Sequence, residues 1–387
     1  MMNQEALRCI LCKKPKCSLQ GCPVHTPVPE AMQLYRAGHI EEAGALLFRN
    51  NPLSAVTSLV CEWKKFCYGN CILNAKNVPV RWYEIEQEIS AQYLFSHRLE
   101  RHSLDHSYDR VAIVGAGPAG IAAAIWLYQT GAEVTLFDAN PRMGGVLRYG
   151  IPSFRLDKKY CDAYEKMLLD AGVEFRENVE VGKDVSLEDL SMEYDAVLVA
   201  AGAEVPATLG IPGESRAVQA LPFLKNPSAY KLGKKVIVIG GGNVAMDACR
   251  TAVRMGVETW VYYRKTYENM PANPLEVQAA KADGVQFKVF QAPVEVKEGG
   301  VVFCDCKNVV PEDGGRVITK VLKGTEHFVE CDTLITAISE KPDPVLTVNA
   351  QAYRNVFLAG DFMSGPATVV DAVKSAHTAV EDILETL

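Results

Sequence analysis

The stretch VAIVGAGPAG, residues 111–120, constrains the fold of this chain more than any other. Four apolar residues typical of a buried strand lead into glycines spaced G-x-G-x-x-G, and a helix-like run follows. In this spacing Gly115 permits a tight turn, Gly117 lets the backbone approach a diphosphate, and Gly120 lets the helix pack on the strand. The diphosphate then lies against the N–H groups of the helix N-terminus. The stretch therefore predicts a dinucleotide site.

An acidic residue at the end of the next strand supports this interpretation. Residues 133–137 read as a strand, and Asp138 follows at about 20 residues from the glycines, where a carboxylate accepts from ribose hydroxyls. An ordinary glycine-rich turn is the alternative. Strand, helix and acid together favour a dinucleotide.

A second unit of this kind, KVIVIGGGNVAMDACR, occupies residues 235–250. The strand after it, residues 259–263, ends at Arg264 and Lys265 instead of at an acid. A cationic pair suits a 2′-phosphate, whereas an acid would hold a free ribose hydroxyl, so NADP(H) is favoured over NAD(H). A solvated basic turn is the alternative.

Composition limits the class of protein and its partners. A chain of 387 residues is long enough for two or three domains. Its net charge of −7 argues against nucleic acid or an anionic membrane as the main partner. The N-terminal residues lack an apolar signal core, and no apolar run approaches the ~18 residues of a membrane span. We expect a cytoplasmic protein that binds neither nucleic acid nor membrane.

Cysteine is concentrated near the N-terminus. Seven of the twelve cysteines precede residue 72: Cys9, Cys12, Cys17, Cys22, Cys61, Cys67 and Cys71. Thiolates suit iron–sulfur clusters or zinc. Seven do not divide into two all-cysteine tetrahedral zinc sites, and C-x2-C with a final Cys-Pro is similar to ferredoxin runs. We therefore favour iron–sulfur clusters; a zinc-binding docking module is the alternative. We expect the five scattered cysteines to be buried.

Periodicity gives the secondary structure around these motifs. Apolar residues at three- and four-residue intervals predict helices over residues 29–36, 40–48 and 82–94. The polar residues 96–110 predict a linker. Further strands are expected within residues 195–202, 331–338 and 356–361. Because these strands alternate with helices, we expect parallel sheets.

Several motifs resemble one family: the small subunit of glutamate synthase, the N-terminal half of dihydropyrimidine dehydrogenase and the bacterial electron-input subunit of that enzyme. They are CPVH at 22–25, NPL at 51–53, GGVLRYGIPSFRL at 144–156, GGGNVAMD at 240–247, and AGD with TVVDAV within 359–373. The resemblance covers essentially the whole chain. It implies FAD, a nicotinamide cofactor and two [4Fe-4S] clusters.

The fold class follows from motifs and resemblance together. We predict a multidomain α+β protein, with an N-terminal α-helical iron–sulfur domain and two Rossmann-like α/β nucleotide-binding domains, the second inserted in the first. The expected domains are 1–107 for the clusters, 108–228 with 346–387 for FAD, and 229–345 for NAD(P)H.

The resemblance also implies the cluster ligands. It assigns Cys9, Cys12, Cys17 and Cys71 to one cluster, and Cys22, Cys61, Cys67 and a non-cysteine residue to the other. Aligning the PV…IE motif selects Glu86 as this eighth ligand, whereas counting from Cys71 selects Gln87. Family members usually have three residues between the third and fourth cysteines, and here there are four. We expect Gly21 to absorb the insertion as a bulge.

Dinucleotide-binding residues are implied in the same way. Arg155 is expected to offset flavin phosphate charge, Asp361 to accept from ribityl hydroxyls, and the Thr368-Val369 backbone to head a helix that faces the flavin ring. For FAD we predict Gly115, Gly117, Pro118, Ala119, Gly120, Asp138, Gly145, Arg155, Val181, Gly360, Asp361, Thr368 and Val369. For NADP we predict Gly240, Gly242, Asn243, Val244, Arg264 and Lys265.

A flavin, a nicotinamide and two clusters together convert a hydride into single electrons. We therefore expect an NAD(P)H-dependent oxidoreductase that passes electrons to a partner protein, and we name no catalytic acid or base because such transfer needs proximity and orientation. We favour the glutamate synthase large subunit as partner; an FMN-containing pyrimidine-reducing subunit and ferredoxin are the alternatives. A disulfide reductase is less favoured because no CxxC follows Gly145 or Gly242. A flavin reductase with a structural cysteine domain is the remaining alternative.

Overall fold

The computed structural model describes residues 4–309 and 318–387 and divides into two compact units. Unit 1 comprises Met1–Arg148, Ser153–Ala203 and Pro342–Leu387, and unit 2 comprises Tyr149–Pro152 and Glu204–Lys341. Unit 2 is thus inserted in the sequence of unit 1.

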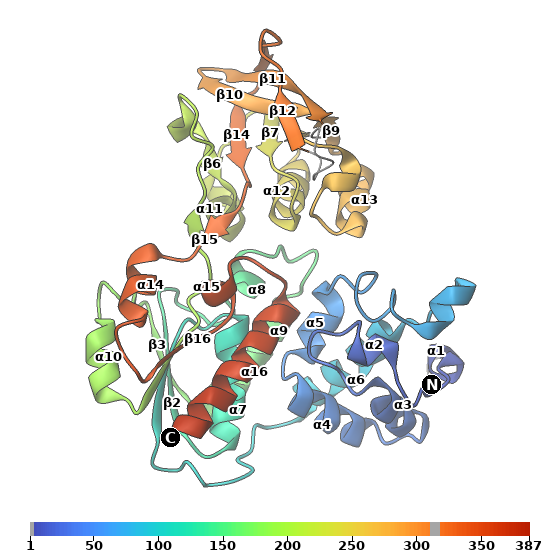
Figure 1. Ribbon diagram of the computed structural model, residues 1–387, viewed down its shortest axis with the longest axis vertical. Helices are drawn as coiled ribbons and strands as arrows, with labels where there is room; N and C mark the ends of the chain where they lie inside the picture. The colour runs from blue at the N-terminus through green and yellow to red at the C-terminus, as the bar shows by residue number, and fades with distance from the viewer. Residues whose placement is uncertain (1–3, 310–317) are drawn as a thin grey trace. The chain divides into compact units, whose positions relative to one another are not determined.

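The N-terminal part of unit 1 consists of short helices, drawn in blue in Figure 1. They are α1 (Gln4–Arg8), α2 (Lys16–Leu19), α3 (Val28–Arg36), α4 (Ile40–Asn50), α5 (Ser54–Val60), the 3-10 helix η1 (Ile72–Lys76) and α6 (Trp82–Ser96). The three helices predicted from periodicity are confirmed as α3, α4 and α6. Their apolar faces form one core, in which Met32, Ile85 and Ile89 are fully buried. The seven cysteines lie mainly in the turns and at the helix ends around this core.

A parallel sheet of five strands, in the order β16-β4-β1-β2-β3, forms the rest of unit 1. Its strands are β1 (Arg110–Val114), β2 (Glu133–Asp138), β3 (Glu174–Glu177), β4 (Ala196–Val199) and β16 (Val356–Leu358). Its helices are α7 (Pro118–Gln129), α8 (Val146–Tyr149), α9 (Lys159–Asp170), α10 (Leu187–Glu193), α14 (Pro344–Ala350), α15 (Asp361–Ser364) and α16 (Val369–Thr386). The strand expected within 356–361 is confirmed as β16, next to β4. The C-terminal segment therefore rejoins the first sheet.

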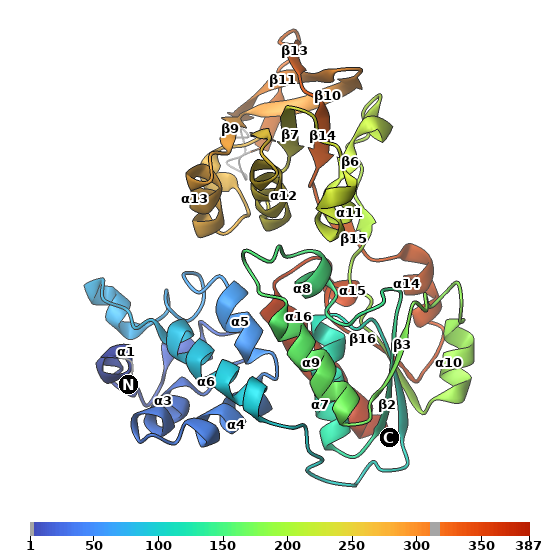
Figure 2. The same cartoon turned by 180° about the vertical axis from the view of Figure 1, so that it is seen from behind.

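Helices α7 and α16 lie side by side, as Figures 1 and 2 show from opposite sides. Trp126 of α7 and His377 of α16 pack edge to face with ring centroids 4.8 Å apart. The helical part is joined to this region by hydrogen bonds: Trp126 Nε1–H donates to the carbonyl of Arg49 (3.1 Å), and the Tyr164 hydroxyl donates to that of Pro52 (2.8 Å). The second bond gives the NPL motif a structural role.

Unit 2 contains a second parallel sheet of five strands, β6-β14-β7-β8-β9. These strands are β6 (Val218–Gln219), β7 (Lys235–Ile239), β8 (Glu258–Tyr263), β9 (Gln286–Val289) and β14 (Thr333–Thr336). The helices are α11 (Ala220–Lys225), α12 (Asn243–Arg254), α13 (Pro274–Ala282) and the 3-10 turns η2 (Glu214–Arg216), η3 (Pro227–Ala229) and η4 (Tyr267–Asn269). Strands β5 (Val205–Pro206) and β15 (Glu340–Lys341) pair with each other.

An antiparallel sheet in unit 2 was not predicted. It consists of β10 (Gln291–Lys297), β11 (Gly300–Val309), β12 (Ile318–Val321) and β13 (His327–Glu330). Cys304 and Cys306 of β11 are buried while Asp305 is exposed, the alternation of a strand with one buried face. All five scattered cysteines are buried, as expected.

In the described part of the chain, no helix is long and apolar enough to cross a membrane.

Candidate cofactor sites

The first glycine turn has the geometry that dinucleotide binding requires. Gly115 has a φ of +100°, and a Cβ there would lie 2.4 Å from the carbonyl oxygen of Ala200. A Cβ on Gly120 would lie 1.9 Å from the carbonyl oxygen of Gly115. A Cβ on Gly117 would meet only Gly145, at 3.8 Å. Gly115 therefore permits the tight turn beside the end of β4, and Gly120 lets α7 pack on β1. Gly117 leaves the backbone open to a diphosphate.

Asp138 ends β2 beside this turn. Its Oδ2 accepts from the backbone N–H of Ala116 (2.7 Å), and its Oδ1 accepts from the backbone and side-chain N–H groups of Asn140 (2.8 and 2.9 Å). The carboxylate thus holds the turn in shape. Since each carboxylate oxygen has two lone pairs, acceptor capacity remains for a ribose hydroxyl.

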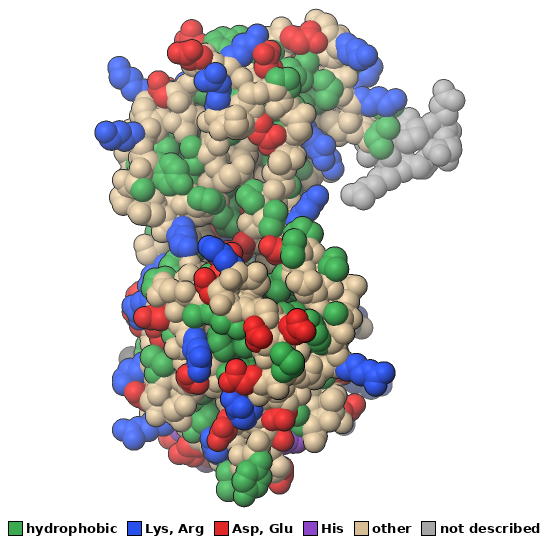
Figure 3. Space-filling model, turned by 90° about the vertical axis from the view of Figure 1, so that its left-hand side faces the viewer, with side chains coloured by type: hydrophobic (Ala, Val, Ile, Leu, Met, Phe, Trp, Pro, Cys, Tyr) green, Lys and Arg blue, Asp and Glu red, His purple; other side chains and the backbone are tan. Residues whose placement is uncertain are grey.

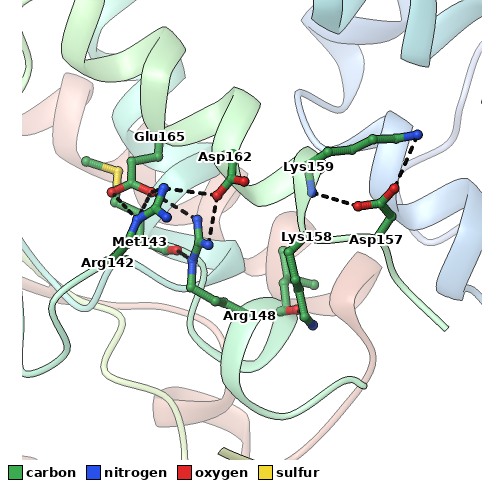
Figure 4. A network of polar contacts seen from close by, with 9 residues as sticks. Arg142, Met143, Arg148, Asp157, Lys158, Lys159, Asp162 and Glu165 are labelled. Carbon is green, nitrogen blue, oxygen red and sulfur yellow. Dashed lines mark hydrogen bonds and ion pairs between the residues drawn. The ribbon is translucent and has the colours of Figure 1, made fainter. Parts of the chain in front are cut away.

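An ion-pair network that sequence reasoning missed fixes the loop that carries Gly145 (Figure 4). Arg142 and Arg148 stand on either side of Gly144 and Gly145, and both form ion pairs with α9. Arg142 lies 2.6 Å from Glu165 and 2.9 Å from Asp162. Arg148 lies 2.9 Å from Glu165 and 2.8 Å from Asp162. The side chains of Arg148 and Glu165 are each 10% exposed, so removal of one partner would leave a poorly solvated charge. The network holds Gly145 where a Cβ would lie 2.7 Å from the Cα of Gly117.

The predicted C-terminal flavin residues lie against the same turn. Gly360 has a φ of +64°, and its Cβ would lie 3.0 Å from the Cβ of Ala119 in the first turn of α7, next to Pro118. Burial raises the pKa of Asp361 to about 6, although its carboxylate accepts from the Ala367 N–H at 3.2 Å.

Thr368 caps α16, which begins at Val369. The Thr368 hydroxyl accepts from the Asp371 N–H, and the Asp371 carboxylate accepts from the Thr368 N–H, both at 3.3 Å. Reciprocal bonds of this kind fix the direction of the helix N-terminus.

Two other predicted flavin residues lie in connecting segments. Arg155 is half-buried between α8 and α9. Val181 follows β3, bridges to Val185, and packs on an apolar cluster that includes Val114 and Phe137 near the carboxyl ends of β1 and β2.

The glycine turn of unit 2 repeats this arrangement. Gly240 has a φ of +145°, and its Cβ would lie 2.1 Å from the carbonyl oxygen of Ala337, at the strand end that corresponds to Ala200 in unit 1. Gly242 caps α12, and its Cβ would meet no atom within 4 Å. Asn243 accepts from the Asn273 N–H (2.8 Å), which ties the turn to the loop before α13. This turn therefore has the same opening for a diphosphate.

The other predicted NADP residues are Val244, Arg264 and Lys265, and they differ in burial. Val244 is half-buried and packs on the core of unit 2. Arg264 and Lys265 follow directly after β8; Arg264 is exposed and Lys265 half-buried. The basic pair thus lies at the carboxyl end of the strand after the glycine turn, where the acid of an NAD site would stand.

The structure gathers the seven N-terminal cysteines around two cavities. One, here named the Glu86 cavity, is lined by Cys22, Cys61, Cys67 and Glu86. The other, the Cys71 cavity, is lined by Cys9, Cys12, Cys17 and Cys71. Val28, Cys67 and Trp82 line both, so the two cavities are neighbours.

The chemistry of both cavities suits positive charge. Burial raises the pKa of the Cys9 and Cys22 thiols, raises that of Cys17 to about 11, and raises those of Cys61 and Cys67 well above the ordinary value. Burial also raises the pKa of Glu86 to about 8. Thiolate and carboxylate forms at such positions need a cationic partner.

The donors around the two cavities suit iron–sulfur clusters. Soft thiolates line both cavities, and a carboxylate lines one of them. Thiolates are the usual ligands of iron–sulfur clusters.

The two candidates for the eighth ligand have different surroundings. Glu86 is buried and lines its cavity. Gln87 points elsewhere: its Oε1 accepts from the Ser58 hydroxyl (2.6 Å) and its Nε2 donates to the Tyr160 hydroxyl (2.7 Å). Only Glu86 is therefore positioned beside the thiols.

The four residues between Cys17 and Cys22 comprise the end of α2 and the turn that contains Gly21. Gly21 does not have the positive φ typical of a glycine bulge. Instead, a Cβ there would lie 2.7 Å from the Cβ of Asn70 and 2.9 Å from the carbonyl oxygen of Phe66. Gly21 is thus required for close packing.

One contact between the cavities and the dinucleotide site was not anticipated from the sequence. Val370, in the first turn of α16, lines the Glu86 cavity. Burial is the main cause of the raised pKa of Cys61, and the charge of Asp371, one residue after Val370, is a smaller cause. Helix α16 therefore borders both the Glu86 cavity and the segment that carries the predicted flavin residues Gly360 and Asp361.

Comparison with known proteins agrees with this organisation. Residues 109–376 match the family model described as pyridine nucleotide-disulphide oxidoreductase, and residues 1–97 match the model described as dihydropyrimidine dehydrogenase domain II, 4Fe-4S cluster. The fold is similar to that of FprA from Mycobacterium tuberculosis, solved in complex with NADPH: the TM-score is 0.62 at 20% identity, over 72% of this chain and 84% of that one.

Curated relatives extend over the whole chain. The glutamate synthase [NADPH] small chain of Escherichia coli K12 is 32% identical over 99% of this chain and 91% of its own length. That of Azospirillum brasilense is 33% identical over 98% of this chain and 88% of its own length. The chain therefore belongs to the glutamate synthase small chain family, as a pyridine nucleotide-disulphide oxidoreductase that carries an N-terminal 4Fe-4S domain.

Proposed function

We propose that this protein takes electrons from NADPH through FAD and two [4Fe-4S] clusters to a partner protein, as the small subunit of a glutamate synthase. The observation that carries this proposal is the contact of α16 with the Glu86 cavity, which in turn shares walls with the Cys71 cavity. A redox chain needs its centres close together. The candidate sites therefore follow one another from the N-terminus of α16, through the Glu86 cavity, to the Cys71 cavity.

The cluster ligands that we propose are those the two cavities gather. Cys22, Cys61, Cys67 and Glu86 would hold one cluster, and Cys9, Cys12, Cys17 and Cys71 the other. Bound FAD would accept a hydride from the nicotinamide and release single electrons to the clusters. Soft thiolates suit iron, and Glu86 would supply a harder oxygen ligand to one cluster.

In this scheme the residues of the chain bind and orient the two dinucleotides. The N–H groups at the start of α7 would bind the FAD diphosphate, and the N-terminus of α16 would stabilise negative charge on the flavin ring. The N-terminus of α12 would bind the diphosphate of NADPH. No side chain is required to act as an acid or base.

The direct test of this function is reconstitution with a glutamate synthase large subunit. Anaerobically purified protein should contain FAD and two clusters' worth of iron and acid-labile sulfide, and NADPH should bleach the visible absorbance of both. Adding the large subunit should then couple NADPH oxidation to glutamate formation from 2-oxoglutarate and glutamine. Bleaching without glutamate, but with reduction of an FMN-containing pyrimidine-reducing subunit or of ferredoxin, would reassign the partner. Zinc in place of iron would overturn the electron-transfer function.

The basic pair after β8 should determine the choice of nicotinamide. Replacing Arg264 and Lys265 together by glutamine is expected to raise the KM for NADPH by about 10- to 100-fold, because charge-assisted contacts to the 2′-phosphate are lost. The KM for NADH should change little. Steady-state kinetics with both cofactors provides the measurement, and Lys281→Gln in the same unit is the control. Equal effects on both cofactors would show that the pair does not recognise the phosphate.

A cytoplasmic location stays a prediction, supported by the reducing conditions that keep such thiols available for iron.

A further inference from the structure

The segments around the Cys71 cavity carry a concentrated positive charge that the composition of the whole chain conceals. Residues 5–30 and 62–84 contain eight lysines and arginines and four glutamates, in a chain whose net charge is −7. Three of these cations form ion pairs, Arg8 with Glu5, Lys65 with Glu62 and Arg81 with Glu84, and the other five are lysines. These two segments supply all five cysteines that line the Cys71 cavity, including Cys67, which also lines the Glu86 cavity. By contrast, on the face drawn in Figure 3 positive and negative side chains are interspersed.

Exposed apolar side chains surround the same cavity. Ile10 and Ile72 line it and are 59% and 50% exposed. Leu7 and Val78 are exposed nearby, where the Arg8 guanidinium donates to the Val78 carbonyl at 2.6 Å and so joins α1 to the segment after η1. A group of large apolar side chains at the surface typically marks an interaction site.

Lysines border these apolar residues. Lys16 lines the cavity, Lys13 and Lys14 directly follow Cys12, and Lys76 ends η1; all four are exposed. In the described ranges 4–309 and 318–387 none of the four takes part in an ion pair. Apolar residues with a charged margin match the usual organisation of a protein interface, and lysines without acidic neighbours attract a negatively charged partner.

We propose that this lysine-bordered apolar surface, defined by Leu7, Ile10, Ile72 and Val78 with Lys13, Lys14, Lys16 and Lys76, docks an electron-accepting protein that presents acidic residues around its own redox centre. The inference rests on the proposed function, because a docking site for electron transfer has to adjoin the outermost redox centre. A partner seated here would cover the Cys71 cavity and exclude water from the route. Opposite charges would accelerate its approach and orient it.

The test uses the holoenzyme and an acidic plant-type ferredoxin as probe. In anaerobic stopped-flow, chemically reduced ferredoxin gives one electron per molecule to the oxidised holoenzyme, and the second-order rate constant is measured against ionic strength. For the Lys13→Gln/Lys14→Gln/Lys16→Gln variant we expect this constant to fall at least about tenfold at low salt, with a weaker salt dependence. The exposed lysines Lys166 and Lys183, changed to glutamine, form the matched control and should leave it unaltered.

Basic cytochrome c is the second probe. Its second-order rate constant with the native protein should be low, and the triple variant should not lower it further. An unchanged ferredoxin rate in the triple variant, or equal losses in the control variant, would overturn the proposal. So would lysine-dependent binding to phosphatidylserine vesicles or to DNA with no change in the ferredoxin rate. Bleaching by NADPH is recorded first for every variant. If the native protein is not bleached, the proposed function itself fails, whereas normal bleaching with lysine-independent ferredoxin kinetics rejects the docking surface alone.

Discussion

Replacing Gly117 by alanine should weaken FAD binding at least about 100-fold, which corresponds to about 2.8 kcal/mol, and leave the protein folded. Its φ of −82° suits alanine, and the new Cβ would meet no protein atom closer than 3.8 Å. The methyl group would instead occupy the space through which the backbone approaches the diphosphate. The measurements are the ratio of flavin to protein absorbance after gel filtration and the FAD dissociation constant of the apoprotein.

Gly242→Ala is the matched control, because a Cβ at Gly242 would meet no protein atom within 4 Å and this variant should also stay folded. This variant should retain FAD and lose affinity for NADPH. Gly120→Ala should behave differently from both, since its Cβ would lie 1.9 Å from the carbonyl oxygen of Gly115 and the packing of α7 on β1 would have to change. Full FAD occupancy in Gly117→Ala would show that the diphosphate lies elsewhere.

Removing one cysteine from either cavity should halve the iron content and leave the flavin in place. Cys22→Ser is expected to remove the cluster of the Glu86 cavity, and Cys71→Ser that of the Cys71 cavity, each with a loss of about half of the iron and acid-labile sulfide. The reason is that a serine hydroxyl replaces a soft thiolate ligand. Iron, sulfide and FAD assays on anaerobically purified protein provide the measurement.

Double variants test how the cysteines are divided. Cys22→Ser/Cys61→Ser should lose no more iron than Cys22→Ser, because both residues line one cavity, whereas Cys22→Ser/Cys71→Ser should lose nearly all of it. Cys161→Ser is the control, since Cys161 is buried near Gly144 and outside both cavities. Additive losses in the first pair would contradict the division.

The eighth ligand is tested by neighbouring residues. Glu86→Ala should lower the iron content or change the electron paramagnetic resonance spectrum of one reduced cluster, because its carboxylate lines the cavity. Gln87→Ala should change neither, since Gln87 is bonded to Ser58 and Tyr160. The opposite result would move the ligand to position 87.

The elements with strong local signals were predictable. The glycine turns, α7, β1 and β2 were recognised because their spacing reflects backbone requirements, such as the positive φ of Gly115. The return of β16 to the first sheet was also predicted, on the resemblance of the segment around Asp361 to a flavin site. The antiparallel sheet was missed because its strands pair within a region that was interpreted only as part of a nucleotide-binding domain.

The sequence by itself determined which chemistry the chain supports, because that depends on residue type and local spacing: two glycine turns before helices, a basic pair after β8, and seven clustered cysteines. Tertiary structure alone decided which groups share a site. It separated Glu86 from Gln87 by their direction on α6, brought the first turn of α16 to a cavity lined by cysteines some 300 residues earlier, and placed exposed lysines around the Cys71 cavity. The physical reason is that long-range neighbours are set by the packing of whole helices and strands, which local sequence patterns do not encode.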